Sequence, residues 1–296
     1  MENRLAVITG ANTGIGFQSA RSLALQGYHV ILTGRFEGKI DWASSTINAM
    51  CEESGATGKA FPMLLDLASF DSVLQFAIDF GLKYDRLDVL LCNAGVMNAP
   101  YTITENGFEL QFQVNYLSHY LLTRLMMPYL QDADSPRLIQ VTSMLGERAK
   151  SGSLKMFSEI AKVSKDQYSP LQSYKESKLA QMLLTRYINR IYREFLFTAA
   201  VHPGVVNSDL FYRRVPKIAK SLLKPVAWLG YVSGTLKTPY DGADTSIWLA
   251  AEKEPLPSGK YWYERKTRPW SEYALDDNLA ADLWDWSGEQ VRTFLG

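Results

Sequence analysis

The sequence predicts an α/β fold of the Rossmann type, a doubly wound parallel sheet of about seven strands with helices on both faces. Three observations lead to this prediction. Apolar, strand-like runs alternate with helical patterns along the 296 residues. A glycine-rich turn joins the first strand pattern to the first helix pattern. No linker, low-complexity run or repeat divides the chain, so we expect a single domain over residues 1–296.

The elements follow one another in a regular order. Short apolar runs predict strands over 4–8, 28–33, 60–65, 87–92, 137–142, 197–201 and 259–263. Helical periodicity predicts helices over 17–26, 41–53, 69–84, 107–129 and 173–194. Gly27 should end the first helix, and Pro62 should place a bulge or an irregular start in the third strand. Ligands of such sheets bind beyond the carboxyl ends of the strands, so we expect the functional site there.

The glycine-rich turn lies between the first strand and the first helix. Its glycines, Gly10, Gly14 and Gly16, follow the spacing Gly-x-x-x-Gly-x-Gly, which differs from the usual Gly-x-Gly-x-x-Gly fingerprint. Glycines let the backbone approach a pyrophosphate, and the helix N-terminus favours its negative charge. The turn therefore predicts a dinucleotide-binding site.

Tyr174 and Lys178 are four residues apart in a predicted helix and so share one of its faces. A free tyrosine has a pKa of about 10. A neighbouring cation favours the phenolate, so we expect Lys178 to lower the pKa of Tyr174 towards neutral pH. Considered alone, the Tyr-x-x-x-Lys spacing favours an ordinary amphipathic helix over a catalytic pair.

Composition excludes several classes of function. A formal net charge of zero gives no indication of a nucleic-acid partner. Two cysteines, Cys51 and Cys92, do not form a disulfide framework and fit a reducing compartment. No group of histidines and cysteines has metal-ligand spacing, so we expect no metal. No signal peptide or membrane span is visible, so we expect a protein without a membrane anchor in the cytoplasm.

Taken together, the motifs resemble the short-chain dehydrogenase/reductase family. They occur in the family's order along nearly all of the chain: the Thr-Gly-x-x-x-Gly-x-Gly turn at 9–16, Asn93-Ala94-Gly95, Asn115, Ser143, Tyr174 with Lys178, and the Pro-Gly segment at 202–208. Four further segments resemble the retinol-dehydrogenase-like branch of the family, namely 115–123, 240–243, 258–262 and 283–284.

The resemblance implies a catalytic set of Asn115, Ser143, Tyr174 and Lys178. By this resemblance Tyr174 is the general acid or base, and Ser143 hydrogen-bonds the substrate oxygen. The main-chain carbonyl of Asn115 holds a water in a proton relay to Lys178, which also binds the nicotinamide ribose. The alternative for Asn115 is a solvent-facing side chain in mid-helix. His119 and His202 are the other candidate bases, but Tyr174 already fills that role.

The resemblance also implies the residues that contact the dinucleotide. They are Gly10, Asn12, Thr13, Gly14, Ile15, Gly16, Arg35, Asp66, Leu67, Asn93, Ala94, Gly95, Tyr174, Lys178, Pro203, Gly204, Val206 and Ser208. For Asp66 the alternative is a cap at the N-terminus of the next helix. Arg35 follows the second strand, where an arginine accommodates the phosphate of NADP. We therefore expect NADP, while Glu37 nearby keeps NAD open.

The expected function is an NAD(P)-dependent oxidoreductase, with NADPH-dependent reduction of a lipophilic ketone or aldehyde favoured, or the reverse oxidation of an alcohol. The residues expected at the substrate are Ser143, Met144, Tyr174 and Phe211, with segment 205–240 covering it. The aromatic residues of that segment could equally pack a lid. Alternative functions are a non-catalytic nucleotide-binding sensor or scaffold, and a reductase of a specialised biosynthetic pathway. Many relatives pair through the helices that bear Asn115 and Tyr174, so the resemblance is also compatible with a homodimer.

Overall fold

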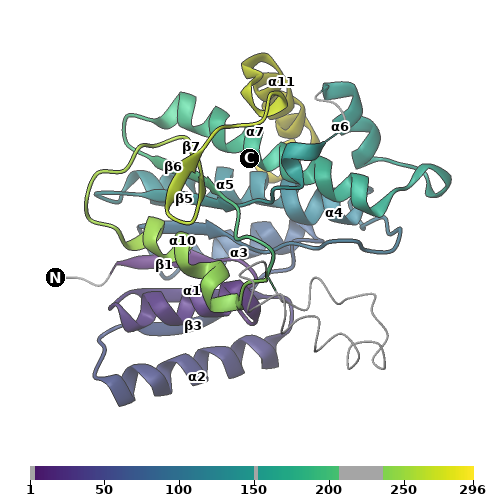
Figure 1. Ribbon diagram of the computed structural model, residues 1–296. Coiled ribbons are helices and arrows are strands. Elements are labelled where there is room, and N and C mark those ends of the chain that lie inside the picture. The colour runs from purple at the N-terminus through teal and green to yellow at the C-terminus, as the bar shows by residue number, and fades with distance from the viewer. Residues whose placement is uncertain (1–3, 150–152, 207–235) are drawn as a thin grey trace.

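The computed structural model describes residues 4–149, 153–206 and 236–296 (Figure 1). Within these ranges, eight strands form one sheet in the order β3-β2-β1-β4-β5-β6-β7-β8. The strands are β1 (Leu5–Ile8), β2 (His29–Gly34), β3 (Lys59–Leu64), β4 (Val89–Cys92), β5 (Arg137–Val141), β6 (Phe197–Val201), β7 (Lys260–Tyr263) and β8 (Lys266–Arg268). The strand order reverses between β1 and β4, and a sheet of this kind places its ligand at that point.

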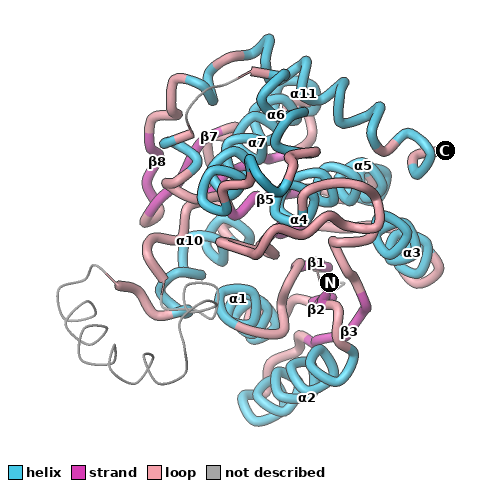
Figure 2. Tube along the Cα trace, turned by 90° about the vertical axis from the view of Figure 1, so that its right-hand side faces the viewer, coloured by secondary structure: helices cyan, strands magenta, loops and turns pink. Residues whose placement is uncertain are grey.

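Helices cover both faces of the sheet, as the sequence predicts (Figures 1 and 2). The buried apolar side chains form two cores. One core contains side chains of α3, α5 and α7, and the other contains side chains of α1, α2 and α10. The helices are α1 (Gly14–Leu25), α2 (Glu37–Ser54), α3 (Phe70–Gly81), α4 (Leu110–Phe112), α5 (Ser118–Gln131), α6 (Leu154–Ala161), α7 (Pro170–Tyr192), α10 (Pro239–Ala251) and α11 (Asp277–Gln290). In the described ranges, no helix has the length and apolarity needed to cross a membrane.

The central strands β1 and β4 are apolar throughout because both of their faces are buried. In β1, Leu5 and Val7 belong to the core on the α3/α5/α7 side, whereas Ala6 and Ile8 belong to the core on the α1/α2/α10 side. This alternation follows from the two-residue period of a strand. A parallel sheet with two covered faces therefore has near-continuous apolar strands, which the sequence analysis identifies correctly.

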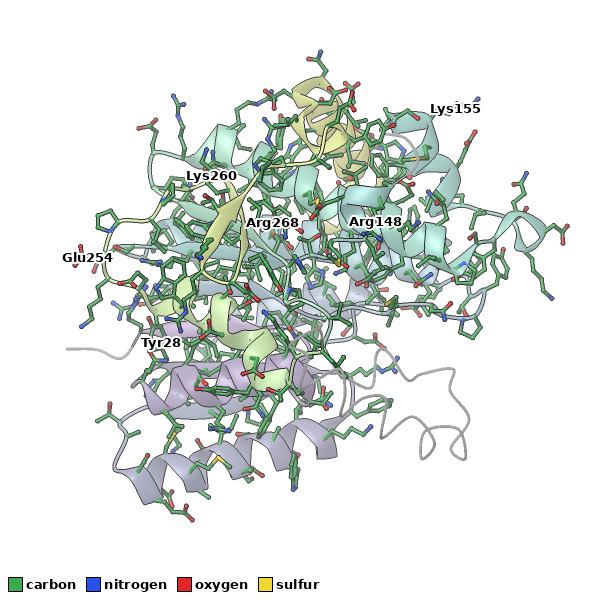
Figure 3. All side chains as sticks on the ribbon, viewed as in Figure 1. Tyr28, Arg148, Lys155, Glu254, Lys260 and Arg268 are labelled. Carbon is green, nitrogen blue, oxygen red and sulfur yellow. The ribbon has the colours of Figure 1, made fainter. Side chains whose placement is uncertain are left out.

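The eighth strand, β8, was not predicted. Strands β1 to β7 pair in parallel, but β8 pairs antiparallel with β7, and Arg268 lies opposite Tyr261. Figure 3 labels Lys260 of β7 and Arg268 of β8 on these two neighbouring strands. All three residues of β8 are exposed. A strand of three polar residues has no apolar pattern, so its sequence gave no signal for it.

The bulge or irregular start expected at Pro62 is absent from β3. The pairing of β3 with β2 runs without interruption from Lys59 to Leu64, and Pro62 lies opposite Leu32. Strand β3 is the edge of the sheet. An edge strand tolerates proline because the missing N–H can face solvent without loss of a ladder hydrogen bond.

The long helix predicted over 107–129 is interrupted. Both carboxylate oxygens of Glu109 accept backbone N–H groups, from Gln111 and Phe112, and so cap a helix that begins only at Leu110. A π-helical turn, η1 (Gln113–Leu117), then separates α4 from α5. Such turns occur frequently at functional sites. Asn115 lies inside this one and is fully buried, so the alternative of a solvent-facing asparagine is wrong.

The C-terminal helix α11 covers the face formed by α5 and α7, and both views show it beside α7 and α6 (Figures 1 and 2). The Trp284 ring packs on Tyr120 of α5 and Tyr187 of α7, with ring centroids 4.8 Å and 5.0 Å away. The hydroxyl groups of Ser287 and Tyr116 are hydrogen-bonded at 2.7 Å. The homodimer with which the family resemblance is compatible would form through this same face.

We predict that the protein is a monomer, because the chain's own α11 occupies the surface of α5 and α7. Light scattering on the full chain should give a mass near 33.4 kDa. A mass of twice that value, together with protection of α5 and α7 from hydrogen exchange on association, would show that α11 moves aside and that the prediction is wrong.

We also predict that Trp284→Ala destabilises the fold, because it removes two aromatic contacts at once. Aromatic pairs contribute roughly 0.5–1.5 kcal/mol each beyond their buried area, so the loss should be about 1–3 kcal/mol. Urea unfolding followed by circular dichroism measures it. Trp42→Ala is the matched control, since Trp42 is 62% exposed and should cost much less. Equal costs for the two variants would contradict the role assigned to α11.

Candidate active site

A cavity of about 450 Å³ opens at the carboxyl ends of the central strands. Most of the residues predicted to bind the dinucleotide line this cavity. They are Gly10, Asn12, Thr13, Gly14, Ile15, Gly16, Arg35, Asp66, Leu67, Asn93, Ala94, Gly95, Tyr174, Lys178 and Pro203. These residues come from widely separated parts of the chain, and the fold brings them to one edge of the sheet. The cavity has further lining residues that the motifs did not indicate: Thr33, Gly34, Phe36, Lys39, Leu65, Val96, Leu110, Val114, Val141 and Thr142.

The glycine-rich turn forms a cradle at the N-terminus of α1. A Cβ atom on Gly16 would lie 2.3 Å from the Gly10 carbonyl oxygen, so only glycine fits there. Gly10 itself has a φ of 63°, which favours glycine. Thr13 precedes α1, but its side chain makes no capping hydrogen bond, so no side-chain cap occupies the first turn's N–H groups. These N–H groups and the helix dipole suit a phosphate, so this part of the cavity fits a dinucleotide.

Thr9 joins the ends of β1 and β4 beneath that cradle. Its Oγ1 accepts the backbone N–H groups of Asn93 and Ala94 at 2.9 Å and 2.8 Å. The Asn93 side chain returns two hydrogen bonds, from Nδ2 to the carbonyl oxygens of Thr9 and Gly10. Both strand ends are therefore fixed to each other where they border the cavity.

His119, one of the two alternative bases, is neutral and fully engaged. A hydroxyl has one hydrogen to donate, and Thr9 Oγ1 already accepts two N–H groups, so it donates to His119 Nε2 at 3.0 Å. His119 therefore carries its proton on Nδ1 and donates it to the Asn115 carbonyl at 3.0 Å. Burial lowers the pKa of His119 to about 4. Because both ring nitrogens of His119 are hydrogen-bonded within the protein, we assign it a structural role.

Asn115 clamps the chain that leaves β4. Its Oδ1 accepts the Val96 N–H at 2.7 Å, and its Nδ2 donates to the Val96 carbonyl and to Ser177 Oγ, both at 2.9 Å. Its main-chain carbonyl accepts the His119 Nδ1–H. Both Nδ2 hydrogens and one lone pair of Oδ1 are thus used in hydrogen bonds that hold the structure together.

Tyr174 and Ser143 meet beside the cavity. Tyr174 is 5% exposed, and the Ser143 hydroxyl hydrogen-bonds its phenol oxygen. Burial raises the pKa of Tyr174 to about 12, and the hydrogen bond from Ser143 offsets this only in part. The expectation that Lys178 lowers this pKa is contradicted. The Lys178 Nζ is 5.7 Å from the centre of the Tyr174 ring, and burial, which disfavours the phenolate, is the largest influence on the pKa of Tyr174.

Lys178 is a buried ammonium at the inner end of the cavity. Its Nζ donates to the Val141 carbonyl at 2.9 Å and to Gln181 Oε1 at 2.7 Å. An ammonium has three donors, so one remains for a ligand. Burial disfavours the charged form and lowers the pKa of Lys178 to about 7.

Two cations border the outer end of the cavity, where the sequence indicated one. Arg35 and Lys39 both line it, and both lie over the Phe36 ring, at 4.9 Å and 5.1 Å from its centre. Lys39 was missed because α2 begins at Glu37 and not at the predicted residue 41. Residues i and i+4 around a first helical turn lie close together. Glu37 does not line the cavity.

Asp66 lines the cavity and is not the cap of α3. That cap is Ser69, whose Oγ accepts the Ser72 N–H. The Asp66 carboxylate accepts the Ala68 N–H at 2.9 Å in a local turn. The helix-cap alternative for Asp66 is therefore wrong.

The remaining predicted residues lie around the cavity or outside the described ranges. Gly204 has a φ of 87°, and Val206 is buried and pairs with Lys237. Met144 is half-buried beside Ser143. His202, the second alternative base, accepts the Gly204 N–H through Nδ1, and burial lowers its pKa to about 4. Ser208 and Phe211 lie outside the described residues, as does most of segment 205–240.

Comparison with known proteins places the chain in a family. The family described as short chain dehydrogenase matches residues 4–158. Retinol dehydrogenase 14 from Mus musculus is 36% identical, over 98% of this chain and 86% of its own. Polyprenol dehydrogenase from Homo sapiens is 35% identical, over 98% and 85%.

A solved structure is also similar to this chain. A short chain dehydrogenase from Shigella flexneri, solved in complex with NADP, superposes with a TM-score of 0.65 at 25% identity, covering 88% of this chain and 96% of its own. The motifs, the sheet order and the cavity agree with these likenesses. The chain belongs to the short-chain dehydrogenase/reductase family of enzymes, within its retinol-dehydrogenase-like branch.

Proposed function

We propose that the protein is an NADPH-dependent reductase of lipophilic ketones or aldehydes that can also run in reverse on the alcohols. One observation carries the proposal: Tyr174, hydrogen-bonded by Ser143 and four residues from Lys178, borders a cavity whose other end is a dinucleotide cradle. A protein that only bound a nucleotide would not need the buried Tyr174 with Ser143 beside it. The sensor or scaffold alternative has no observation of its own in its favour.

The cofactor's nicotinamide, when bound, supplies or accepts the hydride. The chain's residues would hold it in the cavity. The first turn of α1 and the glycine turn take the pyrophosphate, Asp66 and Leu67 border the adenine, and Lys178 uses its third N–H on the nicotinamide ribose. The fit of Gly16 and the uncapped α1 terminus supports this arrangement.

Tyr174 is suited to donate a proton. Since its pKa is raised to about 12, it holds its proton at neutral pH and can pass it to a carbonyl oxygen. The Ser143 hydroxyl, beside it, orients that oxygen and stabilises the charge that develops on it. The reverse direction needs a phenolate, which burial disfavours.

The walls near Tyr174 support a lipophilic substrate. Val96, Leu110 and Val114 line the cavity on the side of α4 and η1. None of these side chains offers a hydrogen bond or a charge to a substrate, so they suit an apolar carbon skeleton. The relatives named as retinol and polyprenol dehydrogenases support the same chemical class. A panel of long-chain and cyclic aldehydes and ketones, followed by NADPH absorbance, tests it. Failure of every lipophilic carbonyl, with turnover only of small hydrophilic ones, would contradict it.

We predict that Tyr174→Phe abolishes most turnover while keeping cofactor binding. The variant loses only the hydroxyl, and loss of a general acid typically costs about 10²–10⁴-fold in rate. Steady-state kinetics measures the rate, and fluorescence titration with NADPH measures the binding. Tyr168→Phe serves as the control, because its hydroxyl bonds the Ala99 carbonyl away from the cavity. Activity near that of the wild type in Tyr174→Phe would refute the mechanism.

We predict that Arg35 and Lys39 together set a preference for NADPH over NADH. A hydrogen bond to a charged group contributes roughly 1.5–3 kcal/mol. Because Arg35 and Lys39 are exposed to solvent, each should contribute an amount at the lower end of that range. Arg35→Ala and Lys39→Ala should therefore each reduce the preference in kcat/KM about tenfold, by weakening NADPH alone.

The double variant Arg35→Ala/Lys39→Ala should use both cofactors about equally. Glu37→Gln is the control, because Glu37 does not line the cavity and its replacement should leave the preference unchanged. A preference that moves in Glu37→Gln but not in the Arg35 and Lys39 variants would assign cofactor choice to Glu37 instead.

A further inference from the structure

The buried ammonium of Lys178 has no charged partner among the described residues. The titratable groups that face it are Tyr174 on its own helix, Cys92 at the end of β4 and His119 on α5. Burial raises the pKa values of Tyr174 and Cys92 to about 12 and lowers that of His119 to about 4. All three are neutral at neutral pH. Dipoles, and not a carboxylate, must therefore stabilise the charge.

Gln181 is the one side chain that hydrogen-bonds this ammonium in the described structure. Its Oε1 lies 2.7 Å from Lys178 Nζ, and the only other acceptor is the Val141 carbonyl. An ammonium can only donate, so the orientation of the Gln181 amide is fixed, with oxygen towards Lys178 and nitrogen away. Gln181 is fully buried, and hydrogen bonds in such surroundings are stronger than in water.

The far side of the Gln181 amide is also held. Its Nε2 donates to Gln140 Oε1 at 3.3 Å, and Gln140 lies on β5 immediately before Val141. Lys178 and Gln181 are three residues apart on α7 and share the face turned towards β5. The amide cannot rotate without breaking its contacts at both ends. Gln140, Gln181 and Lys178 thus form a buried polar chain that leads from the sheet to the cavity.

We infer that Gln181 is a positioning residue, whose amide oxygen aims the Lys178 ammonium at the cofactor pocket and sets how readily it keeps its proton. The inference rests on the proposed function only for its catalytic consequence. Gln181 does not line the cavity, so it acts through Lys178 and not on a ligand. Gln140, one step further away, holds Gln181 in place.

Two substitutions at this position change the ammonium in opposite directions. Gln181→Glu places a carboxylate beside Lys178 and should raise its pKa by about one unit or more. Gln181→Met keeps a similar side-chain volume but removes the acceptor, and should lower that pKa by a comparable amount. A residue that merely filled space would not produce shifts of opposite sign.

The titration of Lys178 can be followed directly, by NMR of isotope-labelled lysine ε-methylene groups in the full chain. The signal that disappears in Lys178→Arg identifies the residue. We expect the order Gln181→Glu, wild type, Gln181→Met, from highest to lowest pKa. Gln140→Met should move the value in the same direction as Gln181→Met but less. Gln75→Met, an exposed position on α3, is the control and should not move it.

The same order should appear in catalysis. A charged Lys178 is lost as pH rises through its pKa, so the alkaline limb of kcat/KM for NADPH should shift upward in Gln181→Glu and downward in Gln181→Met. Thermal melting checks each fold. If Gln181→Met does not fold, Gln181→Glu against wild type still decides. An unchanged Lys178 titration in the folded Gln181 variants would overturn the inference.

The two proposals fail in distinguishable ways. A wild-type protein without reductase activity refutes the proposed function, yet its Lys178 titration still tests Gln181. An active wild type, in which neither Gln181 variant alters the titration or the pH profile, refutes only the role of Gln181.

Discussion

The Thr9 hydroxyl is the contact on which the geometry of the site depends. It accepts backbone N–H groups from Asn93 and Ala94 and gives its own hydrogen to His119, so every hydrogen-bonding capacity it has is used. Through His119 it reaches the carbonyl of Asn115, whose side chain in turn holds Val96. The turn after β4 is therefore fastened at both of its ends. Replacement of Thr9, His119 or Asn115 would leave buried polar groups without hydrogen-bond partners, which destabilises the folded protein.

The cavity has different electrostatics at its two ends. At the outer end, Arg35 and Lys39 are exposed cations that can meet a phosphate without being desolvated beforehand. At the inner end, burial dominates every titratable group: it raises the pKa of Tyr174 and lowers those of Lys178 and His119. The inner end thus holds neutral groups and the Lys178 ammonium, whose charged form burial disfavours. In such a low dielectric, small changes in hydrogen bonding have large effects on protonation.

Local patterns predicted the parts of the fold and site that depend on local chemistry. The apolar strands, the glycine turn and the spacing of Tyr174 and Lys178 are short-range features, and the structure contains all of them. The π-helical turn around Asn115 was missed because five residues are too few to separate its period from that of an α-helix. The position of Lys39 depended on where α2 begins, and helix ends are poorly defined by sequence. The raised pKa of Tyr174 could not be predicted, because burial is a property of the whole fold.

The two outermost strands of the sheet have a consequence for how molecules of this protein behave at high concentration. Strand β3 presents Pro62 in its free row of backbone groups, so one N–H is missing from any template it could offer. Strand β8, at the opposite border, is three residues long, and Lys266 and Arg268 give it positive charge at both ends. A second sheet would meet an interrupted row of N–H groups at one border and positive charge at the other. Both borders of the sheet thereby disfavour edge-to-edge pairing with a second molecule.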